Sequence, residues 1–202
     1  MSHKRPRTAS IVPALTLEGD VRIHLGISKL FHERALCDAV IHVEGEIFHV
    51  HKLVLAATCD YFAAFYCRAS YSMDATGPLT LDGMSANIFR ILLSFVYSGR
   101  CELTEEAQLT PLLEAAARLQ VVPLICEISE AIEARLSPEN AVDTWALADA
   151  LHLSDLAGVP LKHTAKTMMT HNFHTIAESD SLLRLPHALL CALVADDGLR
   201  VR

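Results

Sequence analysis

The chain has 202 residues, 51% of them hydrophobic and 20% charged, so it can bury a sizeable core and does not have a disordered composition. The net charge is −7, and three of the basic residues lie within residues 4–7, which disfavours direct binding of nucleic acid. No apolar run is long enough to span a membrane, and the N-terminus lacks the apolar core of a signal peptide. We expect a soluble intracellular protein whose residues 1–16 form a flexible tail.

The first predicted helix lies within residues 17–36, where apolar residues follow helical spacing. The next segment, residues 37–62, reads CDAVIHVEGEIFHVHKLVLAATCDYF. Its apolar residues flank Gly45, which lies between two glutamates, so the pattern predicts two strands joined by a tight turn. A short apolar helix is expected over residues 53–57, and Asp60 is placed to cap the helix that follows.

A loop, a third strand and a long helix are expected next. Residues 68–78, RASYSMDATGP, are small and polar and contain Gly-Pro, which predicts a loop. Residues 79–81 alternate between apolar and polar and predict a short strand. Ser85 is placed to cap a helix that ends at Gly99, where glycine can adopt the left-handed conformation.

The segment from Cys37 to Phe62 closely resembles the opening of a BTB/POZ domain. The shared features are Cys-Asp before the first strand, Phe-x-x-His-Lys, a Leu-Ala-Ala helix and a Tyr-Phe pair, which are here Cys37, Asp38, Phe48, His51, Lys52, Tyr61 and Phe62. Residues 95–106, FVYSGRCELTEE, strengthen the resemblance, since in that family Phe-x-Tyr-x-Gly precedes a short strand and then Leu-Thr-Glu-Glu. The resemblance implies an α+β fold over residues 17–135, a small β-sheet flanked by helices.

The C-terminal third is expected to be all-helical. Helices are predicted from Thr104 to Leu119, from Val121 to about Leu136, and over residues 155–170 and 173–179. The segment Ser-Pro-Glu-Asn at residues 137–140 resembles the start of a BACK domain, the helical module that follows the BTB domain in kelch-like proteins. Residues 137–202 are therefore expected to form a BACK domain, truncated because the family's domain continues for several more helices. Kelch repeats are absent from the sequence.

The resemblance implies a non-catalytic homodimeric adaptor that links cullin-3 to an unknown substrate protein for ubiquitin transfer. The lack of a signal peptide predicts a cytoplasmic location, and the basic residues Lys4, Arg5 and Arg7 leave a nuclear location open. Residues expected at the dimer interface are Leu25, Leu30, Phe31 and Asp38. Residues expected to contact cullin-3 are Tyr66, Tyr71, Met73 and Asp74. The family's hydrophobic-x-Glu motif is met only in part, because Ala75 stands in place of the glutamate. The first helix pair of the BACK domain, residues 138–172, would add further cullin contact.

Several alternatives stay open at this point. Met73 is equally consistent with an exposed loop residue that binds nothing. The resemblance implies a charged groove formed by Asp38, His51 and Lys52, which either binds corepressor peptides or, as we favour, fixes the fold as a charge pair. The chain as a whole is either the ligase adaptor, a scaffold for transcriptional corepressors, or a truncated dominant-negative dimerisation partner.

The sequence gives no sign of an enzyme. It contains neither a nucleophile motif nor a glycine-rich phosphate loop, so we expect no catalytic residues and no cofactor. Two histidine pairs, His49 with His51 and His171 with His174, fall short of the four ligands of a zinc site, so we expect no metal. The six cysteines are expected to be thiols, with a reactive thiolate left open at Cys67 and Cys101 because each adjoins an arginine.

Overall fold

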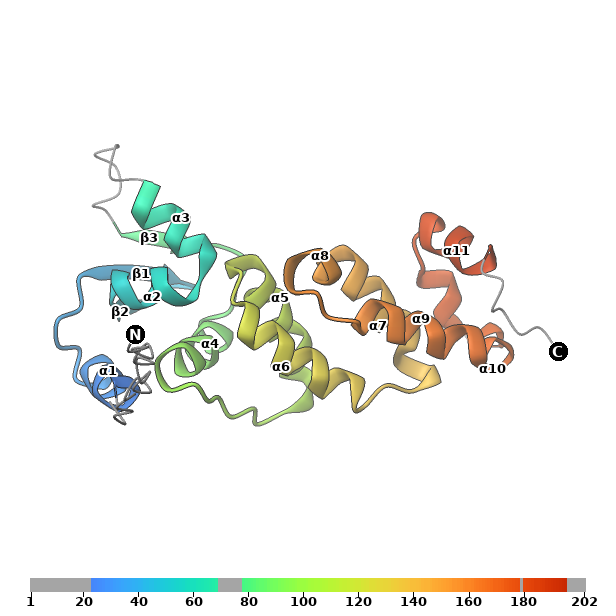
Figure 1. The fold of residues 1–202 in the computed structure, drawn as a ribbon, viewed down its shortest axis with the longest axis horizontal. Coiled ribbons are helices and arrows are strands. Elements are labelled where there is room, and N and C mark those ends of the chain that lie inside the picture. The colour runs from blue at the N-terminus through green and yellow to red at the C-terminus, as the bar shows by residue number, and fades with distance from the viewer. Residues whose placement is uncertain (1–22, 69–77, 179, 196–202) are drawn as a thin grey trace, which may run out of the picture.

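The computed structural model describes residues 23–68, 78–178 and 180–195. The described chain is elongated, with a three-stranded sheet at one end and helices leading to α11 at the other (Figure 1). Its helices and strands are α1 (Ile23–His32), β1 (Ala39–Val43), β2 (Glu46–Val50), α2 (Lys52–Thr58), α3 (Asp60–Arg68), β3 (Leu79–Leu81), α4 (Ala86–Ser98), α5 (Leu109–Leu119), α6 (Val122–Glu133), α7 (Pro138–Ala150), α8 (Leu153–Ala157), α9 (Leu161–His171), α10 (Phe173–Ala177) and α11 (His187–Val194). The predicted α+β class, with a helical C-terminal part, is confirmed.

β1 lies in the middle of the sheet, antiparallel to β2 and parallel to β3. Glu44 and Gly45 form the turn between β1 and β2, with φ values of 49° and 81°. Two residues with positive φ suit a tight hairpin, because the twist of such a turn matches the right-handed twist of the strands. The hairpin and the third strand predicted from the sequence are confirmed.

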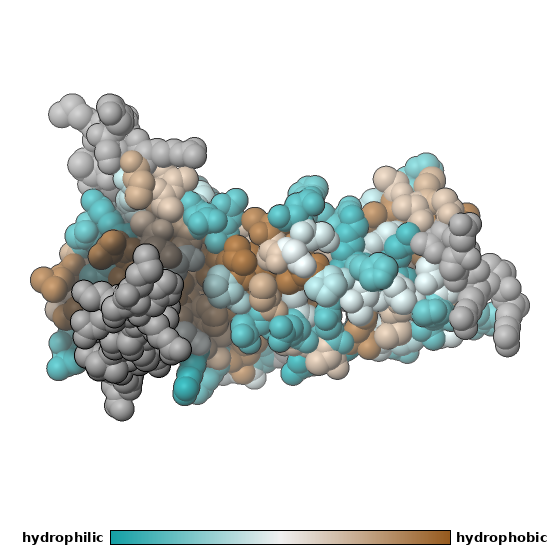
Figure 2. Space-filling model, viewed as in Figure 1, coloured by the Kyte–Doolittle hydropathy of each residue, from teal (hydrophilic) through white to brown (hydrophobic). Residues whose placement is uncertain are grey.

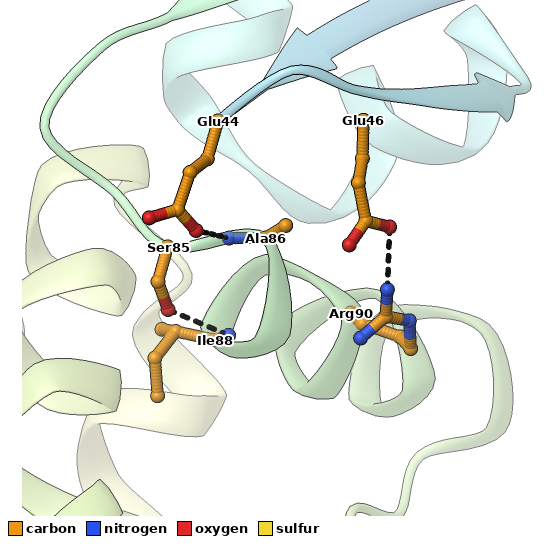
Figure 3. Close-up of polar contacts among 6 residues, drawn as sticks. All are labelled: Glu44, Glu46, Ser85, Ala86, Ile88 and Arg90. Atoms are coloured by element: carbon orange, nitrogen blue, oxygen red, sulfur yellow. Dashed lines mark hydrogen bonds and ion pairs between the residues drawn. The ribbon is translucent and has the colours of Figure 1, made fainter.

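The two glutamates of the hairpin fasten the sheet to α4 (Figure 3). The Glu44 carboxylate accepts a hydrogen bond of 2.9 Å from the Ala86 N–H in the first turn of α4, where negative charge is favoured by the helix dipole. Glu46 forms an ion pair with Arg90 at 2.5 Å, one turn further along the same helix. Ser85 caps α4 as predicted, because its hydroxyl accepts from the Ile88 N–H.

The main core forms where the sheet packs against α4, α5 and α6. One side of the sheet is buried, and its members there are Ile41, Val43, Phe48, Val50 and Leu81. α4 contributes Phe89, Leu92, Leu93 and Tyr97, all 0–1% exposed. The helix ends at Gly99, whose φ of 71° is the left-handed conformation expected there.

The main core does not stop at the end of α6. Ala148 of α7, Leu153 of α8 and Leu161 of α9 are fully buried and belong to the same apolar cluster as the sheet. A second cluster lies further along the chain, around Trp145, Met169, Ile176, Leu189 and Leu193. Hydrophobic residues also reach the surface around α5 and α8, in the middle of the molecule (Figure 2). The boundary predicted at residue 136 stays a prediction, and the apolar packing crosses it.

Three details of the predicted secondary structure are wrong. The helix expected from Thr104 begins at Leu109, after a short 3-10 helix at Glu106–Gln108. The short strand expected after Gly99 does not form, because residues 100–105 pair with no strand of the described chain. The single helix expected over residues 155–170 is two helices, α8 and α9. Gly158, with a φ of 64°, ends α8. Pro160 directly precedes α9, and because proline lacks the backbone N–H that a helix interior needs, α8 cannot continue through it into α9.

Candidate interaction surfaces

α1 presents one side to solvent and one side to the body of the protein. Leu25 is 63% exposed, so its side chain is available for a partner. Leu30 is half-buried. The Phe31 ring is also half-buried and stacks on Tyr97 of α4, with centroids 4.0 Å apart and ring planes within 10°. Phe31 therefore holds α1 against its own chain, and the dimer interface predicted at these residues stays a prediction.

His51 is the most connected side chain of the predicted charged groove. Its Nε2 lies 2.9 Å from the Ala35 carbonyl oxygen, and its Nδ1 lies 3.0 Å from the Tyr97 hydroxyl. The same hydroxyl accepts the His51 backbone N–H at 2.9 Å. The sequence marked His51 and Tyr97 as parts of two motifs, but nothing in it could join residues so far apart in the chain.

Asp38 and Lys52 do not form the charge pair expected from the sequence. The Asp38 carboxylate accepts a hydrogen bond of 2.7 Å from the backbone N–H of Lys52, at the start of α2. The Lys52 ammonium instead lies 5.8 Å from the centre of the Tyr66 ring, a cation–π distance. Asp38 thus anchors the N-terminus of α2, and the groove residues are bound to their own chain.

Of the four residues predicted to contact cullin-3, the structure describes only Tyr66. Its ring stacks near Phe62, with centroids 5.9 Å apart. Burial, followed by the nearby Asp38 and Tyr61, raises the pKa of Tyr66 to about 12, so its hydroxyl stays neutral and can donate a hydrogen bond. Tyr71, Met73 and Asp74 lie outside the described residues, and their predicted role stays a prediction.

A groove that the sequence did not reveal lies between α5, α6 and α7. It has a volume of about 520 Å³, and its walls combine aliphatic and polar side chains, among them Leu109, Ile132, Leu147, Arg135, Asn140 and Asp143. Its position depends on the sharp turn from α6 to α7. There the Asn140 side chain accepts from the Ser137 N–H at 2.8 Å and donates to the Arg135 carbonyl at 2.9 Å. The sequence showed the Ser-Pro-Glu-Asn motif but not the concave surface that it creates.

The histidine pairs offer no assembled metal site. Both ring nitrogens of His51 are engaged by Tyr97 and Ala35, so His51 cannot join His49 as a ligand without breaking those contacts. His174 lies 3.5 Å from the Glu178 carboxylate. Among the residues that the structure describes, no three His, Cys, Asp or Glu side chains gather closely enough to hold a metal ion. In the same residues, no helix is long and apolar enough to cross a membrane.

The thiolate that the sequence left open at Cys101 is not supported. Burial, together with the nearby Glu127, raises the pKa of the Cys101 thiol, so its arginine neighbour does not activate it. Burial also raises the pKa of Cys59, to about 11, and that of Cys37. Cys67 and Cys191 are exposed. At Cys101 the neighbouring arginine in the sequence therefore does not decide the pKa of the thiol, because desolvation by burial is the larger effect.

Comparison with models of known protein families identifies the family of this chain. The family model of the BTB/POZ domain matches residues 27–136, and that of the domain called BTB And C-terminal Kelch, or BACK, matches residues 141–202. The chain therefore belongs to the BTB/POZ family, and it carries a BACK segment of the kind found in kelch-like proteins.

Individual relatives agree with this assignment. The human Kelch repeat and BTB domain-containing protein 2 is 30% identical over 174 residues, which cover 86% of this chain and 27% of that protein. The BTB domain of zebrafish PATZ1 matches in structure with a TM-score of 0.52 and 22% identity, covering 60% of this chain and 99% of that domain. The chain thus spans about a quarter of the length of its curated relative. Proteins of this family are generally adaptors or scaffolds, and their BTB domains commonly dimerise.

Proposed function

We propose that this chain is a non-catalytic homodimeric adaptor of a cullin-3 RING ubiquitin ligase, linking the cullin to a substrate protein for ubiquitination. The observation that carries the proposal is the match to both the BTB and the BACK families over nearly the whole chain. The same proposal places the protein in the cytoplasm, with a nuclear fraction if Lys4, Arg5 and Arg7 act as an import signal.

The groove between α5, α6 and α7 supports a second contact for the cullin. It lies where the BTB and BACK segments meet, within the region from which the first BACK helices would add cullin contact. Its apolar walls suit the burial of a few hydrophobic side chains, which usually supply most of the energy of an interface. Its rim also carries polar side chains, among them Thr110 and Asp143, as is typical of the edge of an interface.

Direct binding tests the adaptor function. Purified chain 1–202 is titrated with the N-terminal region of cullin-3 in a calorimeter, and light scattering gives the mass of the free protein. A dimer that binds with submicromolar affinity supports the proposal despite Ala75. A dimer that does not bind contradicts it, and the corepressor scaffold or a dominant-negative dimerisation partner then becomes the leading function.

Met73→Asp tests the loop that was assigned to cullin from the sequence. A charge in place of an apolar anchor leaves an interface with an unpaired buried carboxylate, so we expect cullin binding to be lost while the dimer stays intact. Calorimetry measures the first effect and light scattering the second. Unchanged affinity would remove Met73 from the interface.

Ala150→Arg tests the groove. Ala150 is exposed, lines the groove and ends α7, so an arginine there fills the concave surface without disturbing the core. We expect cullin affinity to fall by about tenfold or more, the usual cost of blocking a pocket at the centre of an interface. Ala177→Arg is the matched control, since Ala177 is exposed and ends α10 away from the groove. Equal affinity of the two variants would show that cullin does not use the groove.

A further inference from the structure

The connection between α1 and β1 is held in an unfavourable backbone conformation. Arg34 and Leu36 have φ values of 51° and 60°, the left-handed region that residues other than glycine rarely adopt. Leu36 is 79% exposed, so its own packing does not compensate for the strain. Ala35 lies between them, and its carbonyl oxygen is bound by His51 at 2.9 Å. The His51 side chain is therefore a principal tie between this connection and the rest of the domain.

The hydrogen bonds around His51 assign one protonation state. The Ala35 carbonyl can only accept, so Nε2 carries the proton. The Tyr97 oxygen accepts the His51 backbone N–H at 2.9 Å, which leaves the Tyr97 proton for Nδ1 at 3.0 Å. Burial raises the pKa of Tyr97, so this proton is present at every physiological pH. With a neutral imidazole, each of these polar atoms has a partner.

The same two residues also place α1. Tyr97 is 1% exposed, and its ring stacks against the ring of Phe31 in α1, with centroids 4.0 Å apart. His51 holds the chain just after α1 through Ala35, and Tyr97 holds the helix itself through Phe31. A second proton on His51 would turn Nδ1 into a donor, so the buried Tyr97 O–H would lose its acceptor, while the Tyr97 oxygen would receive both the Nδ1–H and the His51 backbone N–H.

We propose that His51 and Tyr97 form a positioning pair that orients α1 for contact with a second copy of the chain, and that this pair works only while His51 is neutral. The dimer in this statement rests on the proposed function above. Acidification should then loosen α1 and weaken the dimer, because histidine is the side chain that ordinarily gains a proton just below neutral pH.

The charged and titratable groups around His51 do not replace the lost contacts. Cys37 Sγ lies 3.8 Å from Nε2, and burial raises the pKa of that thiol, so it offers no thiolate to a charged imidazole. Among the described residues, the Asp38 carboxylate accepts the Lys52 backbone N–H at 2.7 Å, so it offers no acceptor aimed at the Tyr97 hydroxyl. The other charged or titratable groups near the pair, on the elements packed against it, are Arg34, His32 beside Phe31, Lys52 on α2, and the buried thiol of Cys59.

The test compares His51→Gln with the unaltered chain at about pH 7.5 and about pH 5.5, which bracket the ordinary titration of histidine. Glutamine can still donate to the Ala35 carbonyl but gains no proton. Hydrogen exchange of the α1 amides reports whether the helix is held, and sedimentation equilibrium reports the dimer. His32→Gln is the matched control, because His32 lies at the end of α1, is exposed, and bonds the Ser28 carbonyl of its own helix at 2.7 Å and not the Ala35 connection or Tyr97.

We expect acidification to speed α1 exchange and raise the dimer dissociation constant by about tenfold in the unaltered chain and in His32→Gln, the size of effect that the loss of one buried hydrogen bond produces. His51→Gln should show neither response. An unaltered chain whose α1 exchange ignores pH, or a His51→Gln variant that responds like it, overturns the proposal. A chain that is monomeric at both pH values but still loosens α1 supports the positioning pair and removes the dimer from the proposed function.

Tyr97→Phe keeps the test decisive if His51→Gln does not fold. Phenylalanine retains the stack on Phe31 but lacks the hydroxyl that binds the His51 side chain and backbone. We expect fast α1 exchange in this variant already at neutral pH. Exchange as slow as in the unaltered chain would overturn the role of the pair.

Discussion

Burial of ionisable side chains dominates the chemistry of this protein at the residue scale. The pKa of Cys59 is raised to about 11 and that of Tyr66 to about 12, in both cases chiefly by desolvation. Cys37, Cys101 and Tyr97 are shifted in the same direction for the same leading cause. Each of these groups is folded in its neutral form, so none supplies an activated nucleophile.

These shifts predict a loss of stability at high pH. A group whose folded pKa is raised contributes stability that is fully present below its unfolded pKa and lost as the pH rises through the folded value. For Cys59 that window runs from the ordinary thiol pKa of 9.0 to the raised pKa of about 11. We therefore expect the urea midpoint to fall steadily over this range. Cys59→Ala should flatten the lower part of the fall, whereas removing the exposed Cys191 in Cys191→Ala should leave the curve unchanged.

At the scale of the secondary-structure elements, two glycines in open space have opposite roles. Among the residues that the structure describes, an added Cβ meets nothing within 4 Å at either Gly26 or Gly158. Gly26 lies inside α1 with ordinary helical backbone, whereas Gly158 ends α8 with a φ of 64°. Since no neighbour is touched at either position, only the backbone preference of the new residue should decide the outcome.

Alanine at these positions should therefore shift stability in opposite directions. Gly158→Ala forces a residue with a Cβ into the left-handed region, which costs about 1 kcal/mol. Gly26→Ala removes a flexible residue from a helix and should stabilise it by about 0.5–1 kcal/mol. Urea unfolding of both variants measures the two changes. A destabilised Gly26→Ala would mean that Gly26 is needed for close approach of a partner to α1, which is the helix expected in the dimer.

The elements that could be predicted from the sequence are those specified by local signals. Ser85 and Gly99 mark the two ends of α4, and Gly45 marks the hairpin, because each acts on its own neighbours. The break at Gly158 and Pro160 carried an equally local signal, which the helical spacing around it concealed. The strand expected after Gly99 failed for another reason, since a strand needs a partner that no local pattern supplies.

The candidate sites were less predictable, since they depend on residues brought together from distant parts of the chain. His51 was singled out, but its partners Ala35 and Tyr97 lie in other elements. The groove between α5, α6 and α7 exists only once three helices have packed. Likewise, Asp38 and Lys52 suggested an ion pair by charge alone, and the fold instead gave the carboxylate a backbone partner.

At the scale of the whole molecule, the BTB and BACK segments share packing rather than meeting as separate bodies. Leu153 and Leu161 follow the BTB match in sequence, yet both are fully buried in the cluster that contains the sheet and α4. Trp145, the only tryptophan of the chain, belongs to the second cluster. Tryptophan fluorescence therefore reports the C-terminal cluster, while circular dichroism reports all helices of both segments.

We expect the two signals to follow one unfolding transition, because the shared core couples the segments. Leu153→Ala should lower the free energy of unfolding by about 2–4 kcal/mol, the usual cost of removing a fully buried leucine side chain. The midpoints of both signals should therefore fall together. Leu183→Ala is the matched control, since Leu183 is 84% exposed and should change stability by less than about 0.5 kcal/mol. Fluorescence that changes well before circular dichroism in the unaltered chain would instead mean that the BACK helices unfold independently. The groove at the junction would then lose its rigid wall at α7, and the contact proposed there for cullin would depend on a segment that orders only on binding.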